Sequence, residues 1–394
     1  MHDPRRHVPL RDDPWDEAVA RDAIRHIARD ALDRFDARHF WPAHPQESYR
    51  ADGATSLYWG AAGVLWALDY LRRQGAVAFD HDLAAALPQL RANNAAHYAH
   101  EAYPDHSSLL FGAVGADLLA MRLAPDDRTA DALFRSAENN LARPILELMW
   151  GMPGTMLACV VMAEITGEGR WREIYRAQAA RLLADLEETA VGPLWTQDLY
   201  GERLRYLGPV HGYAGNMLAL LRGWAWLDTA QRARITDAIT TTLVATAQRA
   251  PQGANWPAIV TSDETPALVQ YCHGAPGMVT VFADAPFSAV AVDDVLRAGG
   301  DFTWFAGPLA KGSNLCHGTG GNGYAFLKLY RRFGVPLWLD CARAFAMTAI
   351  AQCRAARVRH GQGRYSLWTG DLGLAVYLWD CITGQPRFPT TDIF

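Results

Sequence analysis

The sequence is poor in the features that mark several common protein classes. It has six cysteines in 394 residues and no apolar segment of a secretion signal near its start, so reduced thiols are expected rather than a disulfide scaffold. No run of about 18 apolar residues offers a membrane span. Long runs of lysine and arginine are absent and the formal net charge is -5, which disfavours nucleic acid and anionic membranes as partners. We therefore expect a cytoplasmic protein.

The composition that remains is that of a folded, globular chain. Half of the residues are hydrophobic, 20% are charged and the mean hydropathy is -0.09, so an extensive core is expected and long disordered regions are not. No linker rich in serine, glycine or proline divides the chain. We expect one domain over residues 1–394, in which residues 1–50 supply an N-terminal outer helix and a lead-in segment.

One short motif, Gly-x-x-Gly, recurs seven times along the chain. Each copy leads into an apolar, helix-prone segment such as "TMLACVVMAEITG", and amphipathic stretches such as "WREIYRAQAARLLADLEET" lie between the copies. The first glycines are separated by 39 to 62 residues, which suits two helices and their loops. The seven copies begin at Gly60, Gly112, Gly151, Gly212, Gly274, Gly318 and Gly370.

This alternation predicts an all-α fold, an α/α toroid of seven helical hairpins with seven inner and seven outer helices. An open α-solenoid fits the hairpins nearly as well. The ring is favoured because the first and last repeats, "WGAAG" and "TGDLG", resemble the middle ones, whereas the ends of a solenoid are usually atypical caps. Signals for β-hairpins are sparse.

Alignment of the repeats brings cysteines and histidines into register. His211, His273 and His317 precede the first glycine of their motifs, and Cys272 and Cys316 stand one place earlier. In a closed ring, equivalent positions meet at one rim, so Cys272, Cys316 and His317 would form a Cys2His set. Thiolate and imidazole ligands favour zinc over magnesium or calcium, with a fourth position open for water or substrate. His273 could replace His317 as a ligand or contact the substrate.

A simpler interpretation is that these cysteine–histidine pairs are buried at tight turns. We apply that interpretation to the four other cysteines, which lie in apolar helical stretches and are expected to be small buried hydrophobes. They are Cys159, Cys341, Cys353 and Cys381.

With the repeats aligned, the whole chain resembles the lanthionine synthetase C-like family. "VQYCHGAPG" and "KGSNLCHGTGGNGY" resemble that family's zinc-site signature, and "SLLFGAVG" and "ELMWGMPG" resemble two of its other motifs. The resemblance implies an α/α toroid with one Zn2+ per chain, held by Cys272, Cys316 and His317. It also implies that a thiol adds to dehydroalanine or dehydrobutyrine residues of a peptide or protein, forming a thioether.

The family contains two kinds of thiol-adding enzyme. Its bacterial cyclases use a cysteine of the peptide, and its stand-alone relatives use glutathione as co-substrate. The segments around Cys272 and Cys316 resemble the stand-alone relatives more closely. The cyclases also carry an arginine shortly before the first zinc cysteine, whereas Leu268 and its neighbours here are apolar or neutral, which favours the glutathione type.

The resemblance also assigns roles to further residues. The catalytic histidine falls on His211, as general acid for the α-carbon after the thiol has attacked. The acidic residue of the cyclases falls on Glu147, here Glu instead of Asp, which would orient or charge His211. Apart from the resemblance, Lys311 is a candidate for anchoring a glutathione carboxylate or stabilising the enolate, and a solvated loop lysine fits this position equally well. Asn322 either belongs to this binding site or supports the turn.

Partners and competing functions complete the expectations. The partners would be a dehydroamino-acid substrate, glutathione, and a kinase or dehydratase that makes the dehydroamino acid. A second possibility is a zinc-containing protein that binds glutathione or a small ligand without turnover. A third is a glycoside hydrolase that uses two carboxylates among Asp117, Glu147 and Asp371, but this function leaves the cysteine–histidine pairs unexplained.

Overall fold

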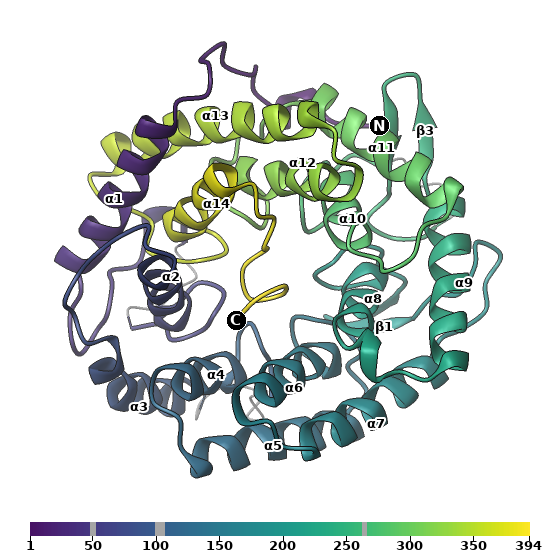
Figure 1. Cartoon of the computed structure of the whole chain (residues 1–394), viewed down its shortest axis with the longest axis horizontal. Coiled ribbons are helices and arrows are strands. Elements are labelled where there is room, and N and C mark those ends of the chain that lie inside the picture. The colour runs from purple at the N-terminus through teal and green to yellow at the C-terminus, as the bar shows by residue number, and fades with distance from the viewer. Residues whose placement is uncertain (48–52, 99–106, 262–265) are drawn as a thin grey trace.

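The computed structural model describes residues 1–47, 53–98, 107–261 and 266–394, and it confirms the predicted all-α toroid (Figure 1). The end of the expected lead-in, residues 48–50, lies outside the described residues. The inner helices are α2 (Ala61–Arg73), α4 (Ala113–Leu123), α6 (Met152–Thr166), α8 (Tyr213–Arg222), α10 (Ala275–Phe282), α12 (Thr319–Phe333) and α14 (Asp371–Thr383). The outer helices are α1 (Glu17–Asp33), α3 (Leu87–Tyr98), α5 (Asp127–Ala142), α7 (Arg170–Ala184), α9 (Thr229–Ala245), α11 (Val290–Ala306) and α13 (Pro336–His360).

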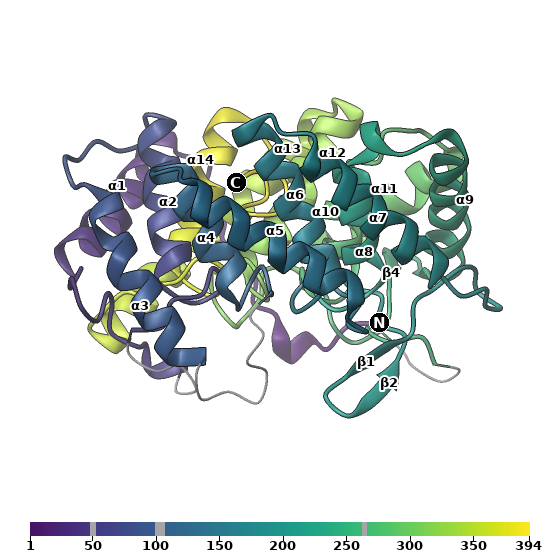
Figure 2. The same ribbon diagram turned by 90° about the horizontal axis from the view of Figure 1, so that it is seen from below.

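The ring closes between its last and first helices. The final inner helix, α14, packs against both α1 and α2, and each inner helix contacts the inner helices of the two neighbouring repeats (Figure 1). Seen from the side, the molecule is a flat ring, with the β1–β2 hairpin extending from one face (Figure 2). This closure distinguishes the toroid from the open solenoid that the repeats alone also allowed.

Each inner helix begins immediately after the first glycine of its motif, and the second glycine allows close packing. A methyl group at Gly63 would collide with the carbonyl oxygen of Leu57 and lie 2.8 Å from Cβ of Leu367. Leu367 belongs to the last repeat and Gly63 to the first, so this contact lies at the seam of the ring. The seven equivalent contacts are Gly63–Leu367, Gly115–Leu57, Gly154–Leu109, Gly215–Leu148, Gly277–Pro209, Gly321–Tyr271 and Gly373–Leu315.

Backbone hydrogen bonds link the turns that precede the inner helices. In five of these seven turns, the residue two places before the first glycine takes part. The N–H of Cys272 donates to the carbonyl of Cys316 (3.1 Å), and the N–H of Cys316 donates to that of Trp368 (3.0 Å). Trp368 continues the series to Tyr58, and Tyr58 to Leu110, each at 3.0 Å. These bonds hold equivalent positions side by side along one rim of the ring.

The chain end occupies the centre of the ring. After α14 it turns inward (Figure 1), where the Phe388 ring stacks on Tyr271 with centroids 4.1 Å apart. Lys328 of α12 is fully buried and forms ion pairs with Asp284 and with Asp392 of this terminal segment. Aromatic stacking and a paired buried charge therefore hold the segment in place.

Two short hairpins were not predicted. Strand β1 (Gln197–Leu199) pairs with β2 (Glu202–Leu204), and β3 (Gln248–Ala250) pairs with β4 (Gly253–Asn255). The first hairpin turns at Tyr200 and Gly201, which both have positive φ angles (56° and 81°), as a two-residue type I′ turn requires. The Tyr-Gly pair was a weak signal because only the second position is a glycine.

The seam contact gives a stability test. Gly63→Ala places a methyl group against Leu57 and Leu367, so we expect a loss of about 1–3 kcal/mol of unfolding free energy, the usual cost of overpacking a core. Gly169→Ala is the matched control, because a methyl group there meets nothing within 4 Å. Thermal unfolding of the two variants measures the difference. Equal melting temperatures would contradict the seam contact.

Candidate active site

The predicted ligand residues meet at the rim. The sulfur atoms of Cys272 and Cys316 and a ring nitrogen of His317 all lie within 4.8 Å of one another. Both cysteines are buried, and His317 is partly buried. The third ligand position is filled by His317, whereas His273 is not in the cluster. Two sulfurs and one imidazole at this spacing form the donor set that zinc prefers.

The protonation of these groups also suits a metal. Burial is the main factor that lowers the pKa of His317, to about 4, and Lys311 and Arg364 lower it further, so the ring is neutral at pH 7 with a free nitrogen lone pair. A hydrogen bond between the two cysteine side chains lowers the pKa of Cys272 and raises that of Cys316. The cluster therefore fits a zinc ion, and a bound cation would favour loss of the remaining thiol proton.

Residues that the sequence analysis did not select support the cluster. Gln270 Nε2 donates to the Cys272 sulfur (2.9 Å), and its Oε1 accepts a hydrogen bond from Arg6 (3.0 Å). Asn314 Oδ1 accepts from the backbone N–H of His317 (3.0 Å). Gln270 stands two residues before Cys272, and Asn314 stands three residues before His317. Their closeness in sequence to these predicted ligands was therefore a usable signal. Arg6 lies 264 residues from Gln270, and no local signal pointed to it.

His211 and Glu147 form a hydrogen-bonded dyad on the same rim. His211 Nδ1 lies 2.9 Å from Glu147 Oε2. Glu147 is fully buried and also accepts backbone N–H bonds from Met149 and Trp150. A carboxylate that already accepts these bonds requires Nδ1 of His211 to be the donor, which leaves Nε2 for a substrate. The Glu at this position therefore reaches the histidine directly.

Aromatic and imidazole rings surround His211. The ring centroids of His273 and Tyr206 lie 6.5 Å and 6.1 Å from it. Tyr200 comes from the tip of the β1–β2 hairpin, with its centroid 5.7 Å away, and its hydroxyl accepts from Trp150 Nε1 at 3.0 Å. Burial, with a smaller contribution from His211, lowers the pKa of His273 to about 4. The sequence analysis missed both tyrosines, since they lie in the unpredicted hairpin and the loop after it.

Asn322 and Lys311 occupy different environments. Asn322 is fully buried and donates to the carbonyl of Val269 (2.8 Å). Asn216 holds the same place in its own repeat and donates to Leu146 (2.9 Å), so this position ties neighbouring repeats together. Lys311 is exposed on the loop before the Cys316 turn, and its charge acts on Cys272, Cys316 and His317.

The carboxylates considered for sugar hydrolysis have other surroundings. Glu147 is engaged with His211, and Asp371 accepts from Arg357 Nε (2.8 Å) and from the backbone N–H of Arg364 (3.2 Å). Asp117 lies in α4, where burial raises its pKa to about 6.

In the described part of the chain, no helix is both long and apolar enough to cross a membrane.

Comparison with known proteins places this geometry in context. The sequence model of the family described as lanthionine synthetase C-like protein matches residues 18–393. Glutathione S-transferase LANCL1 of Danio rerio is 29% identical over 194 residues, covering 48% of this chain and 46% of that protein. LanC-like protein GCL1 of Arabidopsis thaliana is 28% identical over 261 residues, covering 63% of this chain and 58% of that protein. The alignments thus span about half the length of these relatives.

A solved structure shares the fold. Nisin cyclase superimposes with a TM-score of 0.57 at 13% identity, covering 93% of this chain and 100% of that one. The likeness extends around the whole ring and concerns architecture, since so low an identity carries no information about substrate.

Gln270 provides a test of the metal site. Gln270→Leu removes the hydrogen bond to the Cys272 sulfur without removing a ligand, so we expect zinc affinity to fall by about 10–100-fold. Cys272→Ala should abolish stoichiometric binding. Gln252→Leu, the same change in the exposed turn between β3 and β4, is the control and should bind zinc like the parent. Competition with a chromophoric chelator measures all four proteins. Unchanged affinity in Gln270→Leu would contradict the role of this contact.

Proposed function

Because the chain belongs to the lanthionine synthetase C-like family, we propose that it is an enzyme that adds a thiol to dehydroalanine or dehydrobutyrine residues of a peptide or protein. The product is a thioether of the lanthionine type. One observation carries the proposal: the Cys2His cluster and the Glu147–His211 dyad lie on the same rim, with His273 beside His211. A site for activating a sulfur nucleophile thus adjoins a site for moving a proton.

The zinc ion proposed here, one per chain, would be held by Cys272, Cys316 and His317. A free thiol has a pKa of about 8.5 and is only a few per cent ionised at pH 7; bound zinc would supply the missing acidity to a thiol in its open position. Gln270 holds Cys272 in place, and Asn314 holds the backbone of His317. These contacts fix the ligands from both sides of the cluster.

His211 would complete the addition by delivering a proton. As sulfur bonds to the β-carbon, the π electrons of the double bond move toward the α-carbon and the adjacent carbonyl, giving an enolate. Protonated His211 then transfers the Nε2 proton to the α-carbon, and the enolate returns to a carbonyl. Glu147 holds Nδ1 and stabilises the imidazolium form before transfer.

Glutathione is the proposed thiol donor. Lys311 is one of only two lysines in the chain, and the other, Lys328, is buried in the ring. Lys311, Arg364 and Arg6 all act electrostatically on His317, so positive charge gathers beside the cluster. Glutathione carries two carboxylates, which this charge would attract. The Danio rerio relative is named a glutathione S-transferase, which points the same way.

The remaining partners follow from this chemistry. The dehydroamino acid forms by loss of water or phosphate from serine or threonine, so we propose that a separate dehydratase or kinase prepares the substrate, in the cytoplasm. A peptide cysteine as donor would instead make the enzyme a cyclase. A binder without turnover remains the second candidate, because the cation-rich rim would hold glutathione whether or not a reaction follows.

His211 separates an enzyme from a binder. We expect His211→Ala to slow thioether formation by about 10²–10⁴-fold while zinc stays bound, because the dyad is not among the ligands. Glu147→Gln should act in the same direction with a smaller effect. His81→Ala, at an exposed position, is the control. The assay combines zinc-loaded protein, glutathione and a dehydroalanine peptide, and mass spectrometry detects the adduct. No adduct from the parent protein, with glutathione affinity unchanged in His211→Ala, would favour the binder.

A further inference from the structure

Aromatic rings line part of the rim that also carries the candidate active site. The residue just before the first glycine is aromatic in the first three repeats, where it is Trp59, Phe111 and Trp150. In the next three repeats the same position holds a histidine. The ring centroids of Trp59 and Phe111 lie 4.5 Å apart, and those of Phe111 and Trp150 lie 4.6 Å apart. Equivalent positions therefore form a continuous row of rings.

Tyr200 extends this row to the Glu147–His211 dyad. Its hydroxyl accepts a hydrogen bond from Trp150 Nε1 at 3.0 Å, and its ring centroid lies 5.7 Å from that of His211. Tyr200 is 68% exposed, and its φ angle is 56°, a conformation that residues other than glycine and asparagine rarely adopt. The tip of the β1–β2 hairpin thus holds a large exposed ring beside the proposed proton donor, at a cost in backbone strain. Together these four rings form the aromatic row, which consists of Trp59, Phe111, Trp150 and Tyr200.

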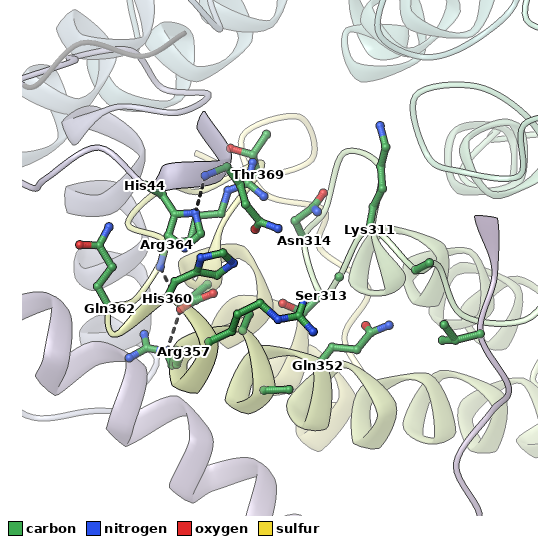
Figure 3. Close-up of a pocket in the computed structure, with 18 residues that line it drawn as sticks. His44, Lys311, Ser313, Asn314, Gln352, Arg357, His360, Gln362, Arg364 and Thr369 are labelled. Atoms are coloured by element: carbon green, nitrogen blue, oxygen red, sulfur yellow. Dashed lines mark hydrogen bonds and ion pairs between the residues drawn. The ribbon is translucent and has the colours of Figure 1, made fainter. Parts of the chain in front are cut away.

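The rim has a different character in the repeats that follow the Cys272 turn. There, polar and positively charged side chains of α13, of the loop before the Cys316 turn and of the loop before α14 line a cavity, among them Lys311, Arg357 and Arg364 (Figure 3). None of the four members of the aromatic row carries a charge. A charged group is therefore favoured at one stretch of the rim, and an apolar group at the other.

The proposed reaction brings the acceptor peptide close to the row. The α-carbon of the dehydroamino acid must lie within reach of His211 Nε2 to receive its proton. An extended peptide advances by about 3.3–3.6 Å per residue, whereas the ring centroids of His211 and Tyr200 are 5.7 Å apart. The side chain of a residue next to the dehydroamino acid is therefore long enough to reach Tyr200 and the Trp150 ring that is hydrogen-bonded to it.

We propose that the aromatic row binds an aromatic or large apolar side chain next to the dehydroamino acid of the acceptor peptide. The inference rests on the proposed function and adds the class of acceptor: a peptide or protein in which such a side chain neighbours the dehydroalanine or dehydrobutyrine. Tyr200 and the partly buried Trp150 make the contact, and the buried Phe111 supports the Trp150 ring. Tyrosine and tryptophan suit this role, because their rings bury a large apolar area and lose little conformational entropy on binding.

Peptides that carry alanine in place of the dehydroamino acid test the row without any reaction. In two of them phenylalanine stands directly before or directly after this alanine, and in the third both positions are serine. Calorimetry on the parent protein should show about tenfold tighter binding for the better phenylalanine peptide than for the serine peptide. Trp150→Leu and Tyr200→Asn should each lower this preference to about threefold or less, because each removes one ring.

Both variants preserve the surrounding backbone. Asparagine tolerates a positive φ angle, so Tyr200→Asn removes an exposed ring without added strain, and Trp150→Leu keeps the backbone N–H that Glu147 accepts. Trp226→Leu is the control, because Trp226 is also partly buried but follows the far end of α8, away from the rim where α8 begins. It should keep the parental preference. Equal binding of all three peptides to the parent, or an undiminished preference in both row variants, would overturn the inference.

Reaction rates separate this inference from the proposed function. With zinc-loaded protein, glutathione and the corresponding dehydroalanine peptides, the ratio of kcat/KM between the phenylalanine and serine peptides should be about ten in the parent and in Trp226→Leu, and lower in the two row variants. If no peptide forms an adduct, the proposed function fails, and the binding experiment still decides whether the row takes an aromatic side chain. If all peptides react at equal rates, the thiol addition stands and the inference is overturned.

Discussion

The contact between the second glycine of each motif and the neighbouring repeat sets the geometry of the whole molecule. Because these glycines have no side chain, each inner helix starts against the turn of the preceding repeat, and Gly63 against Leu367 applies the same rule across the seam. The turns are then close enough for backbone hydrogen bonds between equivalent residues. The bond from Cys272 to Cys316 is one of this series. The packing that closes the ring is therefore also what brings two distant cysteines together.

The candidate catalytic groups lie apart from the packed centre of the ring. The terminal segment fills the centre of the ring, with Phe388 stacked on Tyr271 and Asp392 paired with Lys328. The polar groups that could take part in a reaction therefore lie along one rim. There the side chains of Cys272, Cys316 and His317 meet, and the Glu147–His211 dyad lies with His273 beside it. This arrangement suits the thiol addition that we propose, because a candidate metal site and a group that can deliver a proton lie on the same rim.

The features that follow from the sequence repeats could be predicted. Seven inner helices, closure and the meeting of Cys272 with Cys316 and His317 all follow from equivalent positions in a periodic chain. Residues outside the repeat pattern were missed, because long loops and the N-terminal segment have no register to align. Arg6 reaches Gln270 from the other end of the chain, and Tyr200 reaches His211 from a hairpin with a weak turn signal. Gln270 lies inside the motif VQYCHGAPG, of which only the cysteine and histidine were predicted to have a role.

The most direct test of the account is X-ray absorption at the zinc edge, recorded on the purified protein with and without glutathione. The account predicts two sulfur neighbours and one imidazole nitrogen in the protein alone, and one further sulfur after glutathione is added; in Cys316→Ala one of the two protein sulfurs should be lost. Zinc bound only by nitrogen and oxygen, or a spectrum that glutathione leaves unchanged, would contradict the claim that this rim activates a thiol.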